Sequence, residues 1–183
     1  SFTVNSNLEF HALYSRIDII SGSATPVTDV SNLAVGDQVI ICATHSGKTY
    51  ALSTKQNNNN RSAMEVTAGK LETGIQLLTL QEGAVENTFA FYTGTGYLYA
   101  ASSSSNHLKT DDKLTKNGSW EITASSAVAR GDYTHNVMQF NANSGTPIFS
   151  CYAEDKTDVN FADIMFYKTS DVVTATYYTT LAQ

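Results

Sequence analysis

The sequence has little charge and no concentration of positive charge. Only 15% of its 183 residues are charged, the formal net charge is −6, and lysine and arginine never gather in clusters of more than two. A nucleic-acid-binding surface needs a basic patch that displaces counterions, so we expect no nucleic-acid partner. The same argument disfavours binding to a membrane surface through basic residues.

Long hydrophobic runs are also missing. No apolar stretch approaches the length of a transmembrane helix, so we expect no membrane insertion. The sequence opens without an initiating methionine or a signal-peptide pattern, which predicts a mature fragment or an excised module. Segments with a 3.6-residue hydrophobic period are few, which predicts little helix.

Cysteine is scarce. The two cysteines, Cys42 and Cys151, both fall inside strand-like runs, and two are too few for a disulfide scaffold of this length. They could form one bond if their strands adjoin. The favoured interpretation is that both are small buried core residues.

Motifs that would identify a reaction are absent. The sequence contains no His-Glu-x-x-His, Cys-x-x-Cys, Gly-x-Ser-x-Gly or Walker pattern, so we expect no catalytic residue, metal or cofactor. Asp155 and Asp158 could join a calcium shell, but the dense ladder of an EF-hand loop is lacking and solvated turn acids are favoured. Paired catalytic carboxylates can lie far apart in a chain, which keeps a hydrolase as a minor alternative.

A repeated glycine turn is what the sequence does contain. Gly47, Gly94 and Gly145 lie about 50 residues apart within stretches that align without gaps. Each turn follows a strand-like run and precedes a polar spacer and a second apolar run. The runs before the turns are 39–42, 89–92 and 137–140, and the runs after the spacers are 77–80, 120–122 and 164–167.

Three such units predict an all-β, β-trefoil-like fold with three approximate repeats. One unit cannot bury its apolar face alone, whereas three around a pseudo-threefold axis close a barrel and remove most free sheet edges. A β-sandwich is the alternative, because it also has short strands at regular spacing. We expect residues 1–13 to be an N-terminal extension or the end of a preceding domain, 14–168 the β-domain, and 169–183 a C-terminal strand or linker.

Aromatic residues divide between core and surface in this scheme. Tyr97 and Tyr99 alternate with apolar neighbours, so the two pairs face opposite sides of a strand. Trp120 is predicted to close the core, with Leu78 and Met165 as its equivalents in the other units. His45 and His135 are expected on a solvated rim.

Several phrases resemble a known module. They are residues 51–61, 94–108 and 148–152, and the resemblance covers about Tyr14 to Lys168, with residues 1–13 departing from it. The module recurs in large secreted or cell-surface proteins of gut bacteria, often beside Ig-like repeats and sometimes after an extracellular nuclease domain. The resemblance implies a non-catalytic accessory or adhesion unit outside the cytoplasm and supplies no catalytic residue.

These observations predict a module that binds a glycan or surface ligand for a larger extracellular protein. A structural spacer or protein-docking domain is the alternative. In the predicted fold, ligands contact polar residues of the spacers and rims, whose amides, hydroxyls and carboxylates can bind sugar hydroxyls. The candidate contacts are Asn57, Asn58, Asn59, Asn60, Tyr99, Asn106, Asp111, Tyr152 and Asp155.

Overall fold

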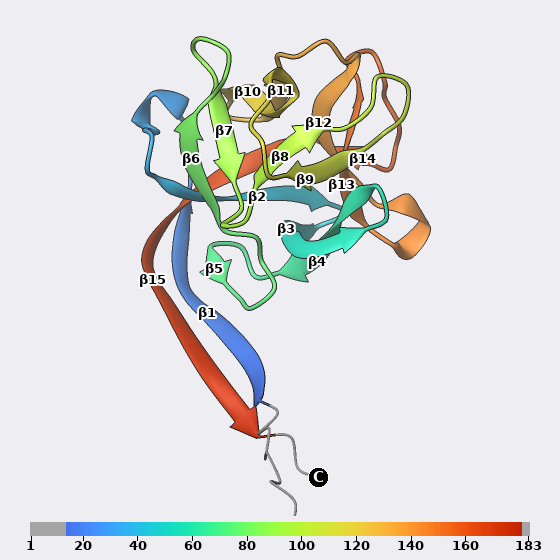
Figure 1. Ribbon diagram of the computed structural model, residues 1–183. Helices are drawn as coiled ribbons and strands as arrows, with labels where there is room; N and C mark the ends of the chain where they lie inside the picture. The colour runs from blue at the N-terminus through green and yellow to red at the C-terminus, as the bar shows by residue number, and fades with distance from the viewer. Residues whose placement is uncertain (1–13, 181–183) are drawn as a thin grey trace, which may run out of the picture.

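The computed structural model describes residues 14–180, which form antiparallel strands joined by turns and three short 3-10 helices. The all-β prediction is confirmed (Figure 1). The expected extension at residues 1–13 and the last residues of the chain, 181–183, lie outside the described residues.

In chain order, the elements are β1 (Tyr14–Pro26), η1 (Val30–Asn32), β2 (Gln38–His45), β3 (Lys48–Asn57), β4 (Asn60–Val66), β5 (Lys70–Leu71), β6 (Leu78–Glu82), β7 (Phe89–Tyr92), β8 (Tyr97–Ala100), β9 (Leu108–Asp111), η2 (Lys116–Gly118), β10 (Ser119–Thr123), β11 (Ser126–Ala129), β12 (His135–Asn141), η3 (Asn143–Gly145), β13 (Ile148–Ala153), β14 (Phe161–Ala162) and β15 (Ile164–Thr180).

The three predicted glycine turns each join two strands. Gly47, Gly94 and Gly145 have φ angles of +76°, +95° and +91°, which side chains with a Cβ rarely adopt. Gly96 is needed for a different reason, because a Cβ there would overlap the backbone oxygen of Asp111. Pro147 lies just before β13, and its carbonyl accepts a hydrogen bond from the Ala63 amide, so its missing N–H costs no ladder bond.

Strand pairing runs in a ring. β2 pairs with β6, β6 with β7, β7 with β10, β10 with β11, β11 with β12, and β12 with β14. β15 begins two residues after β14 ends and pairs with β2. The strands that follow the three turns lie outside this ring: β3 pairs with β4, β8 with β9, and β13 with β4 of the first unit.

The core lies on both sides of β2. Val39, Ile41 and Ala43 belong to the main cluster, and Ile40 and Cys42 to a second, smaller one. Since side chains alternate along a strand, all five are buried only because β2 is covered on both faces.

The aromatic centre of the main cluster contains Trp120, which is fully buried as predicted. Its indole Nε1 donates to the Leu98 carbonyl at 3.1 Å, and its ring stacks on Phe91 at 5.7 Å between centroids. Leu78 is also fully buried. The prediction for Met165 is wrong: it is half-buried at the second cluster, and its neighbour Phe166 contacts Phe91 instead.

Both cysteines are free and buried. Cys42 lies in the second cluster and Cys151 in the main one, which agrees with the favoured interpretation of two core residues. Burial raises the pKa of the Cys42 thiol to about 12 and also raises the pKa of the Cys151 thiol.

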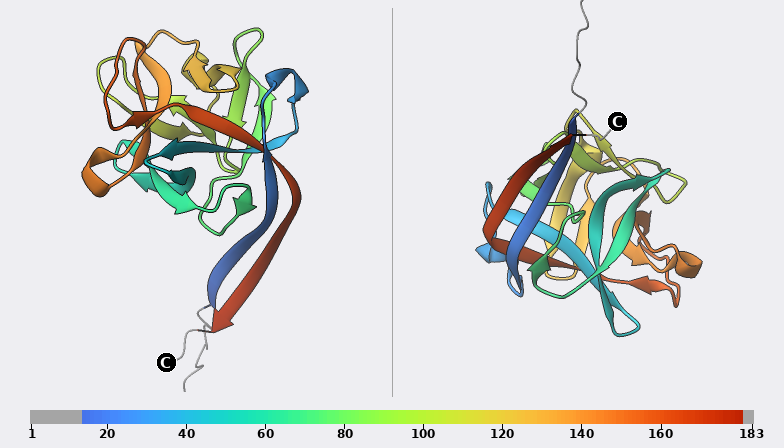
Figure 2. Two further views of the ribbon diagram at one scale, coloured as in Figure 1. Left: turned by 180° about the vertical axis from the view of Figure 1, so that it is seen from behind. Right: turned by 90° about the horizontal axis from the view of Figure 1, so that it is seen from below.

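A two-stranded ribbon leaves the body of the molecule. β1 pairs antiparallel with β15 from Tyr14 opposite Thr180 to Pro26 opposite Tyr167, with one irregularity near Gly22. Figures 1 and 2 show this ribbon, in blue and red, projecting from the compact part. β15 is continuous across the boundary expected after Lys168. Between residues 14 and 180 no helix has the length and apolar character needed to cross a membrane.

Candidate functional site

The spacer of the third unit differs from the other two. In the first unit β4 follows β3 and pairs with it, and in the second unit β9 follows β8 and pairs with it. After β13, residues 154–160 form no strand and every one of them is exposed. Two surface depressions lie beside this segment, which makes it the candidate site.

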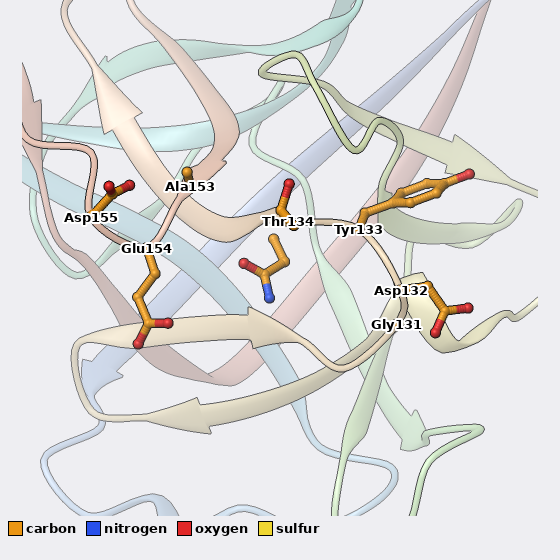
Figure 3. A pocket seen from close by; sticks show the side chains of 8 residues that line it. Gly131, Asp132, Tyr133, Thr134, Ala153, Glu154 and Asp155 are labelled. Atoms are coloured by element: carbon orange, nitrogen blue, oxygen red, sulfur yellow. The ribbon is translucent and has the colours of Figure 1, made fainter.

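The larger depression, here called the acidic groove, has a volume of about 660 Å³. It lies between the loop joining β11 to β12 and the end of β13 (Figure 3). Its lining residues are Gly131, Asp132, Tyr133, Thr134, Asn136, Ala153, Glu154 and Asp155.

One wall of the acidic groove is held by hydrogen bonds. The Thr134 hydroxyl donates to the Ser103 carbonyl at 2.7 Å, and the Asn136 amide donates to the Ala129 carbonyl at 3.2 Å. Gly131 allows the side chain of Asn117 to approach, since a Cβ at residue 131 would overlap it. Loop geometry is therefore fixed before any ligand arrives, which lowers the entropic cost of binding.

The opposite wall carries carboxylates. Figure 3 shows Glu154 and Asp155 on the segment after β13, across the groove from the loop that holds Asp132 and Tyr133. The turn that presents them is closed by a 3.0 Å bond from the Lys156 amide to the Ala153 carbonyl. The eight lining residues include three acids and neither lysine nor arginine, so the groove disfavours anions.

Two tyrosines lie near one end of the groove. Tyr99 of β8 is half-buried, and burial raises its pKa, with smaller contributions from the charges of Asp111 and Tyr133. The pKa of Asp111 is lowered chiefly by a hydrogen bond from the Lys113 amide. Of these residues only Tyr133 lines the groove.

The smaller depression, here called the Gln139 pocket, has a volume of about 270 Å³. It borders the later part of residues 154–160, at Thr157 and Asp158, where β12 meets β14. Its lining residues are Gln139, Thr157, Asp158, Phe161, Ala162 and Asp163.

The asparagine run of the first spacer has a different environment. Asn58 and Asn59 form a two-residue turn between β3 and β4. Only Asn58 of residues 57–60 is exposed. Gln56 donates to the carbonyls of Asn58 and Asn60, which fixes the turn.

Asn60, Asn106 and Tyr152 are brought together by the fold. The Ser150 hydroxyl donates to the Asn106 carbonyl at 2.7 Å and contacts the Asn60 side chain. The Tyr152 hydroxyl accepts from Asn141 at 2.8 Å and from Asn106 at 3.4 Å. Tyr152 is 8% exposed, so its polar atom serves these internal contacts. Asp155 is the one residue of the predicted set that lines the acidic groove.

The environments of the histidines differ from the solvated rim that the sequence predicts for His45 and His135. The ring of His45 contacts Phe140 at 5.8 Å between centroids. His135 is half-buried and its Nδ1 has no hydrogen-bond partner in the described part of the chain, whereas a solvated rim was expected. The pKa of His107 is lowered by burial, by Lys109 and by His135.

Tyr133, Glu154 and Gln139 are site residues that the sequence prediction missed as ligand contacts. Glu154 belongs to an acidic group that the sequence showed, but Tyr133 and Gln139 are single residues whose position depends on strand pairing. Among the described residues no group of three or more histidine, cysteine, aspartate and glutamate side chains is arranged to hold a metal ion.

Comparison of the chain with protein-family models, with curated proteins and with solved structures finds no match.

Proposed function

We propose that this chain is a non-catalytic, extracellular accessory module that binds a glycan at the acidic groove. The observation that carries the proposal is a preformed depression of about 660 Å³, lined by carboxylates, an amide and a tyrosine, at the one spacer that lacks a strand. Such groups hydrogen-bond to sugar hydroxyls and pack on sugar rings. The resemblance to a module of secreted and surface proteins of gut bacteria supports the extracellular location.

A β-trefoil-like arrangement is part of the proposal. It is supported by the ring of strand pairs: β2 pairs with β6 and β7 with β10, and in the third unit β12 pairs with β14, the short strand that leads into β15. β11 is an additional strand between the second and third units. In this scheme only the spacer of the third unit, residues 154–160, offers a binding site, so the module has one site and not three.

A glycan array probed with the labelled chain tests the function. We expect hits among neutral or amino-containing glycans, and at least about tenfold weaker binding for Asp155→Asn and Tyr133→Ala. Glu86→Gln is the matched control, because it removes one exposed carboxylate far in sequence from the groove. Silence of the wild-type chain across the array, or equal loss in the control, overturns the proposal.

A protein-docking or spacer role is the second candidate, favoured by the β1–β15 ribbon. Among the described residues no third strand pairs with β1 before Gly22 or with residues 169–175 of β15. Open backbone edges of this kind can add a strand from another protein. Val173→Lys, at a site that is 58% exposed on the ribbon, should abolish capture of neighbouring domains and leave glycan binding unchanged if docking is the function.

A further inference from the structure

The outer edge of β15 carries backbone groups without a partner strand. Thr174 of β15 lies opposite Ile20 of β1, and the Ile20 amide donates outside the ladder, to the Thr73 hydroxyl at 3.3 Å. Since the N–H and C=O of one residue in an antiparallel strand point to the same side, Ile20 and Thr174 form a non-hydrogen-bonded pair. The N–H and C=O of Thr174 therefore point away from β1, where no strand of the described chain pairs with residues 169–175.

The matching edge of β1 is closed where the ribbon leaves the body. Gly22 and Ser23 pair with β5, and the Ala24 amide donates to the Gly69 carbonyl at 2.9 Å. The Ile20 amide is also occupied, as described above. At this end of the ribbon β15 therefore offers the open edge.

The open edge lacks the features that usually prevent strand addition. Residues 172–180 contain no charged residue and no proline, and consist of valine, threonine and tyrosine with one alanine. Natural sheets protect a free edge with lysine, proline or a bulge, and the one irregularity of this ribbon lies near Gly22, at its base. A ribbon of only two strands is marginally stable in water, so further strands would stabilise it.

The pattern of this edge is complementary to itself. Antiparallel pairing of two β15 strands about a two-fold axis at Thr174 places each Val173, which is 58% exposed, opposite Ala175 of the second copy. No like charges face each other there, whereas the net charge of −6 makes two copies repel in general. Because the ribbon projects from the compact part (Figures 1 and 2), two ribbons can lie side by side with the bodies at opposite ends.

We propose that two copies of this chain dimerise through the outer edges of their β15 strands, which gives a four-stranded antiparallel sheet in the order β1–β15–β15–β1. The Thr174 N–H of each copy donates to the Thr174 carbonyl of the other. Val173 of each copy packs against Ala175 of the other. The inference is independent of the acidic groove, but a dimer carries two such grooves, and the gain in avidity for a polymeric glycan rests on the proposed function.

Sedimentation velocity over a concentration series tests the dimer. We expect a reversible, concentration-dependent shift from monomer to dimer. Thr174→Pro removes an N–H that makes no bond to β1, so it should block the edge while circular dichroism shows the fold retained. Thr174→Pro and Val173→Lys should each weaken dimerisation at least about tenfold. Val35→Lys is the matched control, because this valine of the body is 62% exposed, and dimerisation should be unchanged.

Cysteine cross-linking tests the register. Thr174→Cys places two thiols at the two-fold axis, where the Cα atoms of a hydrogen-bonded pair lie about 5.5 Å apart, within the range of a disulfide. Oxidation should therefore give a dimer that a reductant separates, and Glu86→Cys, at an exposed position of the body, should not.

A wild-type chain that stays monomeric up to millimolar concentration overturns the inference, as does a dimer that neither Thr174→Pro nor Val173→Lys weakens. A monomer that captures a neighbouring domain through the ribbon also overturns it, in favour of the docking candidate above. A dimer that these variants weaken, found together with a silent glycan array, supports the inference and removes the acidic-groove function.

Discussion

The first and third spacers are both polar in sequence but have opposite environments. The β3–β4 hairpin turns its polar groups inward: Gln56, Asn60 and Arg61 bond to carbonyls and side chains of the second and third units. Residues 154–160 leave theirs to solvent beside two depressions. A polar spacer is therefore a structural clamp where a strand backs it, and its side chains are left to solvent where none does.

Among single substitutions in the two spacers, replacement of Arg61 should lower the free energy of unfolding most. It is 5% exposed, and its guanidinium donates to the carbonyl of Ser53, to Gln76 and to Thr110. Burial lowers its pKa. Arg61→Ala leaves these buried acceptors without a donor, so we expect the free energy of unfolding to fall by about 3 kcal/mol.

Urea denaturation measures this loss, with Lys55→Ala as the control. Lys55 is an exposed residue of the same hairpin, and its replacement should cost less than about 0.5 kcal/mol. A similar, small effect of both substitutions would show that the first spacer is not a clamp.

Alkaline pH should lower the free energy of unfolding through the two buried cysteines. Burial raises the pKa of Cys42 to about 12 and that of Cys151 as well. The folded thiols keep their protons when the unfolded ones lose them, so stability is intact below the unfolded pKa of about 8.5 and falls as pH rises above it. At about pH 10 we expect a loss of about 2 kcal/mol per thiol.

The double variant Cys42→Ala, Cys151→Ala separates this effect from other titrations. Its free energy of unfolding, measured under reducing conditions from neutral to alkaline pH, should decline less steeply than that of the wild type. Parallel curves would assign the alkaline loss to tyrosine or lysine instead.

Ser150→Ala tests the link between the first spacer and the rest of the fold. Ser150 is fully buried, and its hydroxyl joins Asn60 to the Asn106 carbonyl. We expect thermal unfolding to show a loss of about 1 kcal/mol, the usual value for one internal hydrogen bond. Ser103→Ala, which changes an exposed serine in the loop that contains Asn106 and retains its carbonyl, should be neutral.

Glu154→Gln and Asp155→Asn should have the smallest effect on stability. Both side chains are exposed, so each change should alter the free energy of unfolding by less than about 0.5 kcal/mol. Glycan binding should nevertheless weaken in both. Destabilisation without any binding change would make the third spacer a clamp like the first.

The sequence predicted the parts that depend on local chemistry. The glycine turns and the burial of Trp120 follow from backbone φ angles and alternation, which neighbouring residues determine. Met165 was placed one residue from the true contact, Phe166. A shift of one residue reverses the face of a strand, and short apolar runs leave that register open.

The candidate site depended on long-range pairing. Gln139 becomes a pocket residue only because β12 pairs with β14, and Tyr133 only because its loop lies across from the end of β13. Asn60 looked like a ligand contact because its partner, Ser150, is distant in the sequence. Whether any predicted contact binds a ligand stays a prediction.

The β1–β15 ribbon also determines how the molecule responds to tension. Tyr14 and Thr180 are paired at the same tip, and the strands run antiparallel from there into the body. A force that separates these two residues loads the ladder one rung at a time, as in opening a zipper, instead of shearing all rungs together. The ribbon should therefore open at low force and lengthen while the compact all-β body and its grooves keep their shape.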